Sequence, residues 1–245
     1  MLSEAGCLSV AAFDAVRARS QPVQLVIFDC DGVLIDSEPL TDRVVSAALA
    51  ELGWRISPAE CHGLFLGMSF YDMVPLIEAR TSRPLPPVWV DKLVERLVAV
   101  LAAEVEMIDG AGDALAATAA LGLPWRVASN SSPAEMAAKF GRVGLAGAVD
   151  GRLHSVVDLL PSGGRGKPAP DIFLAAAAAE GVPPDACIVV EDSVPGARAA
   201  KAAGMQCLGF SPSGDGAQLV AEGAAPFHAM RDLPALFRAA VKRMA

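Results

Sequence analysis

Short apolar runs rich in β-branched residues alternate with segments of helical periodicity from Val23 onward. Runs of this kind are typical of strands that are buried on both faces of a parallel sheet. The predicted strands are residues 23–28, 125–128, 152–157, 187–190 and 205–210. The helices predicted between them are residues 111–121, 133–143, 171–180 and 195–203, and each is followed by a glycine suited to end a helix. This alternation predicts an α/β fold, with a doubly wound, Rossmann-like parallel sheet.

One interval interrupts the alternation. Between residues 38 and 106 there are helical patterns and no convincing strand; the predicted helices are residues 40–52, 58–65, 71–80 and 88–105. We therefore expect an inserted, all-helical cap domain at 38–106. The sheet domain then comprises residues 22–37 and 107–245, and residues 1–21 form an N-terminal extension of unknown purpose, with a loosely packed helix ending at Pro22.

Composition narrows the classes of function. The chain has 245 residues, of which 53% are hydrophobic and 20% charged, so it is long and apolar enough for a substantial core. Its net charge of −8 argues against nucleic acid as a partner, and no apolar run is long enough for a membrane span. Five scattered cysteines without a C-x-x-C pair, together with an amino end that does not resemble a signal peptide, predict a cytoplasmic protein with reduced thiols.

Polar residues follow the predicted strands at the points where ligands bind in open parallel sheets. They are Asp29 and Asp31, Ser129 and Asn130, Lys167, and Glu191 and Asp192. Four carboxylates brought together would repel one another and raise their own pKa values. A hard divalent cation with oxygen ligands removes this conflict, and Mg²⁺ commonly combines carboxylates with a substrate phosphate.

Each of these features also has a purely structural interpretation. Asp31 with Gly32 is common in turns, and Glu191-Asp192 before Ser193 fits a solvated strand end or a helix N-cap. A single Lys167 is most often a surface residue. Taken one at a time, each feature is more consistent with a structural role than with a functional one. Taken together and in this order, each after a predicted strand, they favour a functional site.

The same residues carry a resemblance to a known family. The segments 28–38 (FDCDGVLIDSE), 127–130 (VASN), 166–173 (GKPAPDIF) and 190–198 (VEDSVPGAR) resemble the four motifs of the haloacid dehalogenase (HAD) superfamily. The resemblance covers roughly residues 23–210. It is nearest to the phosphatase and β-phosphoglucomutase-like branch, which has a helical cap. The segments 127–143 and 230–237, together with the fourth motif, further resemble sugar phosphatases of the 6-phosphogluconate phosphatase type.

The resemblance implies a role for each site residue. Asp29 would attack phosphorus and form an aspartyl-phosphate, and Asp31 would protonate the leaving alcohol and then activate water. Mg²⁺ would be held by Asp29, Asp192 and the Asp31 carbonyl, with Glu191 close by or bound through water. The phosphoryl oxygens would be bound by Ser129, the Asn130 amide and Lys167, an arrangement suited to the electrostatics of phosphoryl transfer.

Departures from the family patterns separate the possible activities. Dehalogenases lack an acidic residue at the position of Asp31. β-Phosphoglucomutases carry a cap histidine and an arginine at the positions that are Thr41 and Phe70 here. The expected activity is therefore hydrolysis of a small sugar or organic-acid phosphate, such as a 6-phosphogluconate-like or phosphoglycolate-like ester. A sugar-phosphate mutase is the alternative, and a non-catalytic binding protein would have lost a site residue that is kept here.

The cap is expected to select the leaving group. The candidates are in its apolar loop: Leu66, Gly67, Met68, Ser69 and Phe70. An equally good interpretation is that these side chains only pack the cap against the sheet domain. The expected partner is a small phosphorylated metabolite, without nucleic acid or membrane. A monomer is expected, with a dimer left open.

Overall fold

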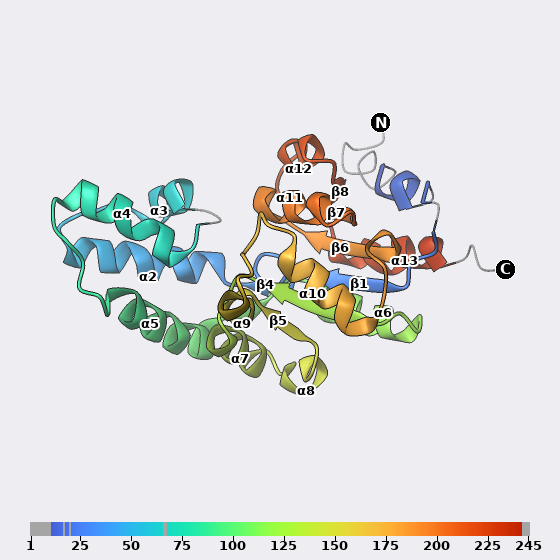
Figure 1. Cartoon of the computed structure of the whole chain (residues 1–245), viewed down its shortest axis with the longest axis horizontal. Helices are drawn as coiled ribbons and strands as arrows, with labels where there is room; N and C mark the ends of the chain where they lie inside the picture. The colour runs from blue at the N-terminus through green and yellow to red at the C-terminus, as the bar shows by residue number, and fades with distance from the viewer. Residues whose placement is uncertain (1–10, 17, 20, 66–67, 242–245) are drawn as a thin grey trace. The chain divides into compact units, whose positions relative to one another are not determined.

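The computed structural model describes residues 11–16, 18–19, 21–65 and 68–241, and Figure 1 shows the course of the chain. The residues fall into two compact units. The sheet unit takes in residues 1–34, 107–132 and 149–245, and the helical unit takes in residues 35–106 and 133–148. The chain therefore leaves the sheet unit twice.

Six parallel strands form the sheet unit. They are β1 (Leu25–Phe28), β4 (Trp125–Ser129), β5 (Leu153–Ser155), β6 (Cys187–Glu191), β7 (Gln206–Phe210) and β8 (Ala225–Phe227). Their order across the sheet is β5-β4-β1-β6-β7-β8, with every neighbouring pair parallel. The order reverses at β1, which lies between β4 and β6. This confirms the predicted doubly wound α/β fold and places the expected ligand edge at the ends of β4, β1 and β6.

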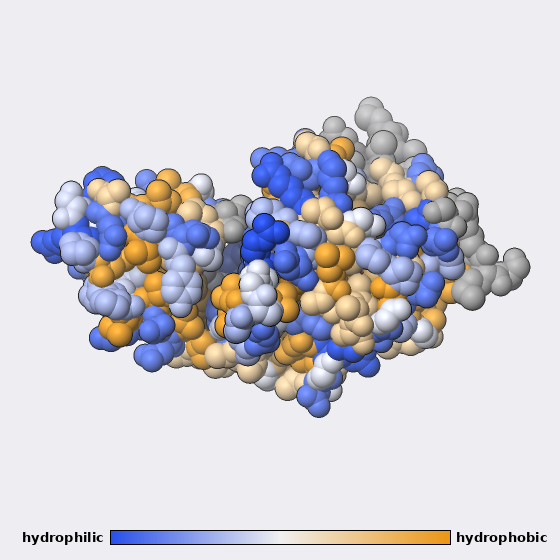
Figure 2. All heavy atoms as spheres, in the orientation of Figure 1, coloured by the Kyte–Doolittle hydropathy of each residue, from blue (hydrophilic) through white to orange (hydrophobic). Residues whose placement is uncertain are grey.

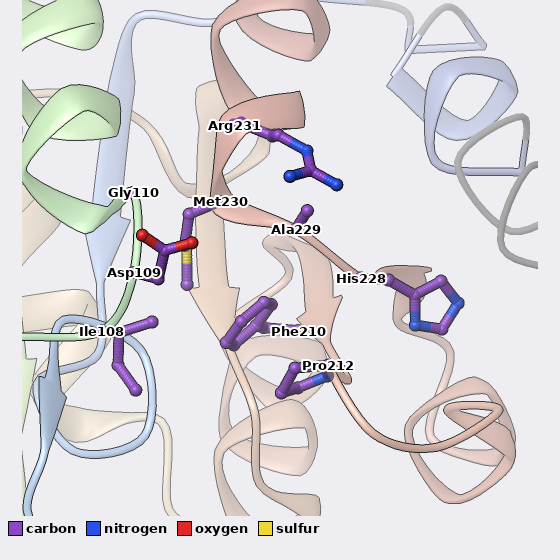
Figure 3. A pocket seen from close by; sticks show the side chains of 9 residues that line it. All are labelled: Ile108, Asp109, Gly110, Phe210, Pro212, His228, Ala229, Met230 and Arg231. Carbon is purple, nitrogen blue, oxygen red and sulfur yellow. The ribbon is translucent and has the colours of Figure 1, made fainter.

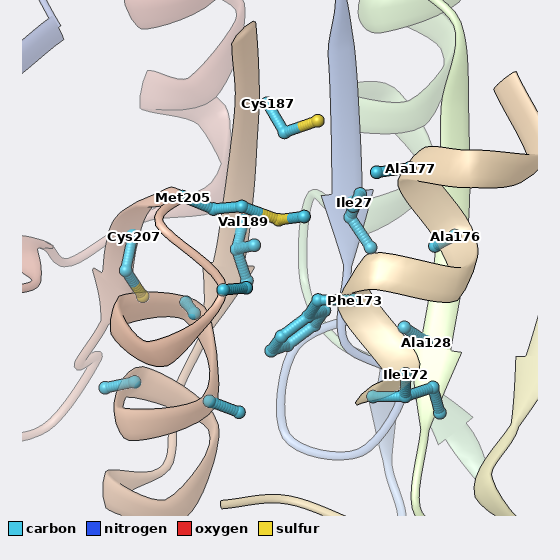
Figure 4. Packing of buried hydrophobic residues seen from close by; sticks show 14 of the residues in the cluster. Ile27, Ala128, Ile172, Phe173, Ala176, Ala177, Cys187, Val189, Met205 and Cys207 are labelled. Carbon is cyan, nitrogen blue, oxygen red and sulfur yellow. The ribbon is translucent and has the colours of Figure 1, made fainter. Parts of the chain in front are cut away.

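Helices cover both faces of the sheet because successive strand residues point to opposite sides. Ile27 and Val189 face α10 (Asp171–Glu180) and α11 (Val194–Ala202), and Figure 4 shows Phe173 of α10 among them. On the other face, Phe28 meets Phe237 of α13 (Leu233–Val241) edge to face, at 6.3 Å between ring centroids. Helix α6 (Ala111–Ala120) packs beside α13. The strands that end at the predicted site are therefore covered by helices on both faces of the sheet.

The segment before β1 is attached to the sheet unit. Residues 11–16 are helical, and Ala12 and Val16 are buried. The Arg19 guanidinium donates to the carbonyl of Cys187 at 3.2 Å and to Gln206 Oε1 at 3.0 Å, at the first residues of β6 and β7. These contacts lie at the amino ends of the strands, opposite the edge where the predicted site residues follow the strands.

The helical unit contains α2 (Glu38–Glu51), α3 (Pro58–Phe65), α4 (Phe70–Thr81), α5 (Trp89–Glu104) and α7 (Pro133–Arg142). Helix α5 buries Val90, Leu93, Leu97 and Leu101, a stripe with the spacing of one helix face. Helices α2 and α7 both pack against α5. The helical insertion predicted after the first strand is confirmed, since α2–α5 occupy that interval without interruption by the main sheet.

Four features differ from the sequence-based expectation. The strand predicted at 152–157 is confined to Leu153–Ser155, because the next residues form the helix Val156–Leu159. Strand β8 was not predicted, and neither was the small sheet of β2 (Ile35–Asp36) with β3 (Glu106–Met107). Helix α7 has the predicted bounds within one residue, but it groups with the helical unit because it packs along α5. The remaining short elements are α8 (Ala146–Val149), α9 (Val156–Leu159), η1 (Leu160–Ser162), η2 (Pro184–Ala186), α12 (Ala217–Ala221) and η3 (Met230–Asp232).

The surface carries a mixture of polar and apolar residues. On the face shown in Figure 2, hydrophilic and hydrophobic residues are interspersed over both units. The largest exposed apolar side chains of the helical unit are Leu64, Tyr71, Leu76 and Val88. None of the helices in the described ranges has the length and apolar character needed to cross a bilayer.

Candidate active site

Three neighbouring strands bring the predicted site residues to one edge of the sheet. Ser129 ends β4, Asp29 follows β1, and Glu191 ends β6. The Asp29 amide continues the strand pairing by donating to the Val190 carbonyl at 2.9 Å. Parallel strands end at a common edge, so the order β4-β1-β6 alone brings together residues that are far apart in the sequence.

A buried ammonium group lies between two carboxylates. Lys167 Nζ donates to Asp29 Oδ1 at 2.5 Å and to Glu191 Oε1 at 2.7 Å. The side chains are 4%, 9% and 0% exposed, in the order Lys167, Asp29, Glu191. The ammonium also lies 4.9 Å from the centroid of the Phe173 ring. Charged groups this deeply buried are stable only when paired, so the three side chains depend on one another.

The electrostatics follow from burial and pairing. Burial raises the pKa of Asp29 to about 7; Lys167 acts in the opposite direction, and the nearby carboxylates Glu191 and Asp31 raise the pKa further. Burial lowers the pKa of Lys167, but Asp29 and Glu191 together outweigh it and hold this pKa above its usual value. Lys167 is therefore charged at neutral pH, while Asp29 needs a further positive charge to be fully ionised.

Glu191 connects Lys167 to the loop that follows β6. Its Oε2 accepts from the Asp192 amide at 3.0 Å, the Ser193 amide at 3.0 Å and the Ser193 hydroxyl at 2.9 Å. Ser193 in turn caps α11 by accepting from the Gly196 amide at 3.1 Å. The capping interpretation of this segment is correct, and the loop that caps the helix also fixes the Glu191 carboxylate.

The acidic cluster has the chemistry of a cation site. Asp29, Glu191 and Asp192 each offer an oxygen, and these oxygens lie within 4.8 Å of one another. Hard divalent cations take oxygen ligands of this kind, so the residues present fit a metal ion. Gly32 leaves room for the Asp192 carboxylate, since a Cβ at Gly32 would lie 2.0 Å from Asp192 Oδ2. Gly32 also has φ of +73°, which a side chain would strain.

Asp31 lies in the same unit and is held by two serine hydroxyls. Ser129 Oγ donates to Asp31 Oδ2 at 3.2 Å, and Ser131 Oγ donates to the same oxygen at 2.9 Å. Asn130 is engaged differently, because its Oδ1 accepts from the Lys167 amide at 3.0 Å. Its side chain thus positions the backbone of the lysine loop, a contact that the sequence did not indicate.

Sequence reasoning gave no role in this site to four residues that shape it: it indicated Gly32 only as a turn residue and Ser193 only as a helix cap, and it did not single out Ser131 and Gly196. The signal for Ser193 was present, since serine three residues before Gly196 is a usual N-cap spacing. Gly196 is required by Glu191, because a Cβ at that position would lie 1.8 Å from Glu191 Oε1. Nothing in the spacing of Ser131 separates it from an ordinary loop serine.

Gly196→Ala is expected to disturb the site by displacing Glu191. The added methyl group displaces the Glu191 carboxylate, so Lys167 loses one of its two partners and the stability falls by about 1–3 kcal/mol. Urea unfolding measures this change. The matched control is Gly141→Ala in α7, where a Cβ meets nothing within 4 Å, and this variant should gain up to about 1 kcal/mol from helix propensity. Equal stabilities for the two variants would contradict this role of Gly196.

The predicted substrate loop belongs to the helical unit. Leu66 and Gly67 lie outside the described residues. Met68 is half-buried, and Phe70 is the first residue of α4. Ser69 caps this helix, accepting from the Asp72 amide at 3.2 Å and donating to Asp72 Oδ2 at 2.6 Å. Contact of these residues with a substrate stays a prediction.

A cavity of about 360 Å³ lies elsewhere in the sheet unit. Figure 3 shows its lining, which comes from the loop after β3, the end of β7 with the loop that follows it, and the segment after β8 with η3: Ile108, Asp109, Gly110, Phe210, Pro212, His228, Ala229, Met230 and Arg231. None of the predicted site residues lines it. The clustered charges and hydroxyls of the candidate site therefore do not line this cavity, which is a separate feature of the fold.

Known proteins are similar to this chain in sequence and in fold. The model of the haloacid dehalogenase-like hydrolases matches residues 23–204. The 6-phosphogluconate phosphatase of Escherichia coli K12 is 31% identical over 221 residues, covering 89% of this chain and 96% of the relative. Hexitol phosphatase B of the same organism is 34% identical over 196 residues, covering 77% and 85%. The crystal structure of a haloacid dehalogenase-like protein of unknown function from Agrobacterium tumefaciens superposes with a TM-score of 0.74, at 39% identity over 89% of this chain and 98% of that one.

The chain belongs to the haloacid dehalogenase-like hydrolases. This confirms the resemblance carried by the four sequence motifs, all of which lie within the matched residues. The predictions of an enzyme and of a phosphatase of this family are confirmed as well. The helices α2–α5 are the inserted cap of such structures.

Proposed function

We propose that this protein hydrolyses a small sugar or organic-acid phosphate monoester, with Mg²⁺ as cofactor and Asp29 as nucleophile. The observation that carries the proposal is the Asp29 carboxylate, which is buried after β1, pairs with the Lys167 ammonium and belongs to a carboxylate cluster suited to a cation. A carboxylate placed in this way is an oxygen nucleophile whose charge is balanced by its surroundings. The sugar-phosphate class is supported by the two Escherichia coli phosphatases named above.

In the first step an Asp29 carboxylate oxygen attacks phosphorus, and the bond to the leaving oxygen breaks as the aspartyl-phosphate forms. Asp31 gives its proton to that leaving oxygen. In the second step Asp31 takes a proton from water, whose oxygen attacks the phosphorus and returns Asp29 as a carboxylate. Lys167 neutralises the phosphoryl oxygens, assisted by the Ser129 hydroxyl and the Asn130 amide.

Mg²⁺, when bound by Asp29, Asp192 and the Asp31 carbonyl, supplies positive charge that orients and polarises the phosphoryl group. Glu191 is better suited to holding Lys167, because both of its oxygens already accept hydrogen bonds. The four described cysteines have free thiols and are buried, in keeping with the reducing cytoplasm that we propose as the location.

Hydrolysis is tested by assaying phosphate release across 6-phosphogluconate, phosphoglycolate, hexose phosphates and β-glucose 1-phosphate. We expect release from at least one ester with Mg²⁺, loss on chelation with EDTA, and recovery when Mg²⁺ is added back in excess. Conversion of β-glucose 1-phosphate to glucose 6-phosphate without free phosphate would instead identify a mutase. That result would mean that Thr41 and Phe70 do not prevent mutase chemistry. Release that is unaffected by chelation would contradict the metal requirement.

A further inference from the structure

Two hydroxyl groups donate to one oxygen of Asp31. Ser131 Oγ lies 2.9 Å and Ser129 Oγ 3.2 Å from Asp31 Oδ2. A carboxyl oxygen has the lone pairs to accept both hydrogen bonds. The two serines therefore fix the rotation of the Asp31 side chain, which is the group proposed to move protons.

The Ser129 hydroxyl is needed in two places. It already accepts from the Ser131 amide at 3.0 Å, and its only proton points to Asp31. To bind a phosphoryl oxygen, as proposed above, Ser129 must turn this proton away from Asp31. Ser131 is then the serine that continues to hold Asp31 while substrate is bound.

Ser131 is itself fixed by the neighbouring strand. The Ser155 hydroxyl donates to the Ser131 carbonyl at 2.7 Å. Ser155 is 1% exposed, ends β5 and is aligned with Ser129 in the parallel pairing of β4 and β5. It also accepts from the Val157 amide at 3.1 Å and so caps α9. Two strand ends thus determine where the Ser131 hydroxyl lies.

We propose that Ser131 is a positioning residue that holds Asp31 for proton transfer to the leaving group, with Ser155 as its support. This inference rests on the proposed phosphatase function. Because Asp31 Oδ2 accepts from both serine hydroxyls, they fix the orientation in which the Asp31 carboxyl group delivers its proton. As the phosphorus–oxygen bond breaks, its electron pair stays on the leaving oxygen, which takes this proton from Asp31.

The test compares two kinds of leaving group in a Ser131→Ala variant. An alkyl phosphate, the best ester of the panel above, needs a proton on its leaving oxygen, whereas p-nitrophenyl phosphate leaves as a stable anion. We expect kcat/KM, which covers the steps through formation of the aspartyl-phosphate and excludes its later attack by water, to fall about 10–100-fold for the alkyl ester and less than about threefold for p-nitrophenyl phosphate. Ser131→Thr keeps the hydroxyl and should restore most of the alkyl rate.

Two further variants support the comparison. Ser155→Ala should show the same preference more weakly, since it loosens Ser131 without removing its hydroxyl. Ser162→Ala is the matched control, because its hydroxyl donates only locally, to the Leu159 carbonyl, and both rates should stay unchanged. Thermal melting of each variant checks that it is folded.

The outcomes separate this inference from the function on which it rests. Equal losses of kcat/KM for both esters in Ser131→Ala would overturn the positioning role and leave the phosphatase intact. Failure of the unaltered protein to release phosphate from either ester would overturn the proposed function, and the positioning role with it. A Ser131→Thr variant as slow as Ser131→Ala on the alkyl ester would also overturn the role of the hydroxyl.

Discussion

Replacing Asp29 with asparagine is expected to abolish phosphate release, with a loss in kcat on the order of 10⁴-fold or more. Asparagine has nearly the same shape, but its side chain has no carboxylate oxygen to form a bond with phosphorus. Lys167 keeps Glu191 as its partner at 2.7 Å, so the variant should remain folded. The loss therefore reports the nucleophile, separately from the stability of the site.

Two measurements make this prediction specific. In the unaltered protein, acid quenching during turnover followed by peptide mass spectrometry should find a phosphoryl group on the peptide that contains Asp29, and the variant should show none. The matched control is Asp150→Asn, the same change at an exposed position of the sheet unit. It should keep its full rate. An Asp29→Asn enzyme that retained more than about a tenth of the rate would assign the attack on phosphorus to another group.

Much of the fold could be predicted because burial leaves a direct mark on sequence. A strand buried on both faces needs a continuous apolar run, as in residues 25–28 and 187–190, and both strands form where the runs predicted them. Strand β8 escaped prediction since it has three residues, one of them Pro226, and lies at the edge of the sheet. Edge strands of this length are set by pairing with a neighbour, which no local pattern records.

The grouping of α7 illustrates a second limit. Its helical periodicity was visible in residues 133–143, yet periodicity shows only that one face of a helix is covered. Which element covers it depends on the three-dimensional path of the chain. In the structure the cover is α5, so the segment groups with the helical unit, although it follows a strand of the sheet.

For the site, residue types and strand ends indicated the chemistry, but the hydrogen-bond partners did not follow from them. Asp29, Lys167 and Glu191 were expected to converge, and the structure brings them within hydrogen-bond distance. The hydrogen bond from Ser131 to Asp31 joins residues that are 100 positions apart in the chain. Side-chain direction at such separations is determined by packing and strand register, which become known only with the fold.

Among the substitutions considered, removal of the buried Lys167 ammonium is expected to have the largest effect on the free energy of unfolding. Lys167→Met keeps an unbranched apolar side chain, one atom shorter than lysine, but it leaves Asp29 and Glu191 buried without their shared partner. Removing one member of a buried ion pair costs about 3–5 kcal/mol. Phosphate release should fall by about 10²–10³-fold as well, because a positive charge at the phosphoryl group is lost.

The loss of stability in Lys167→Met is expected to depend on pH, and its direction follows from the pKa of Asp29. Asp29 in the intact site has a pKa of about 7, and Lys167 acts to lower it, so without the lysine the folded-state pKa of Asp29 rises further. An acid whose pKa is raised by folding makes the folded state less stable as pH rises toward that pKa. The deficit of Lys167→Met should therefore grow as pH rises through about 7 and shrink in acid, where Asp29 binds a proton.

Urea unfolding of metal-free protein at about pH 6 and about pH 9 measures both the deficit and its pH dependence. Lys201→Met provides the matched control, as the same substitution at an exposed position of α11 should alter stability by less than about 0.5 kcal/mol at either pH. Added Mg²⁺ should narrow the deficit of Lys167→Met, because a cation among the carboxylates replaces part of the lost charge. A variant as stable as the unaltered protein at both pH values would show that Asp29 and Glu191 do not need Lys167, and would remove the electrostatic basis for its role at the phosphoryl group.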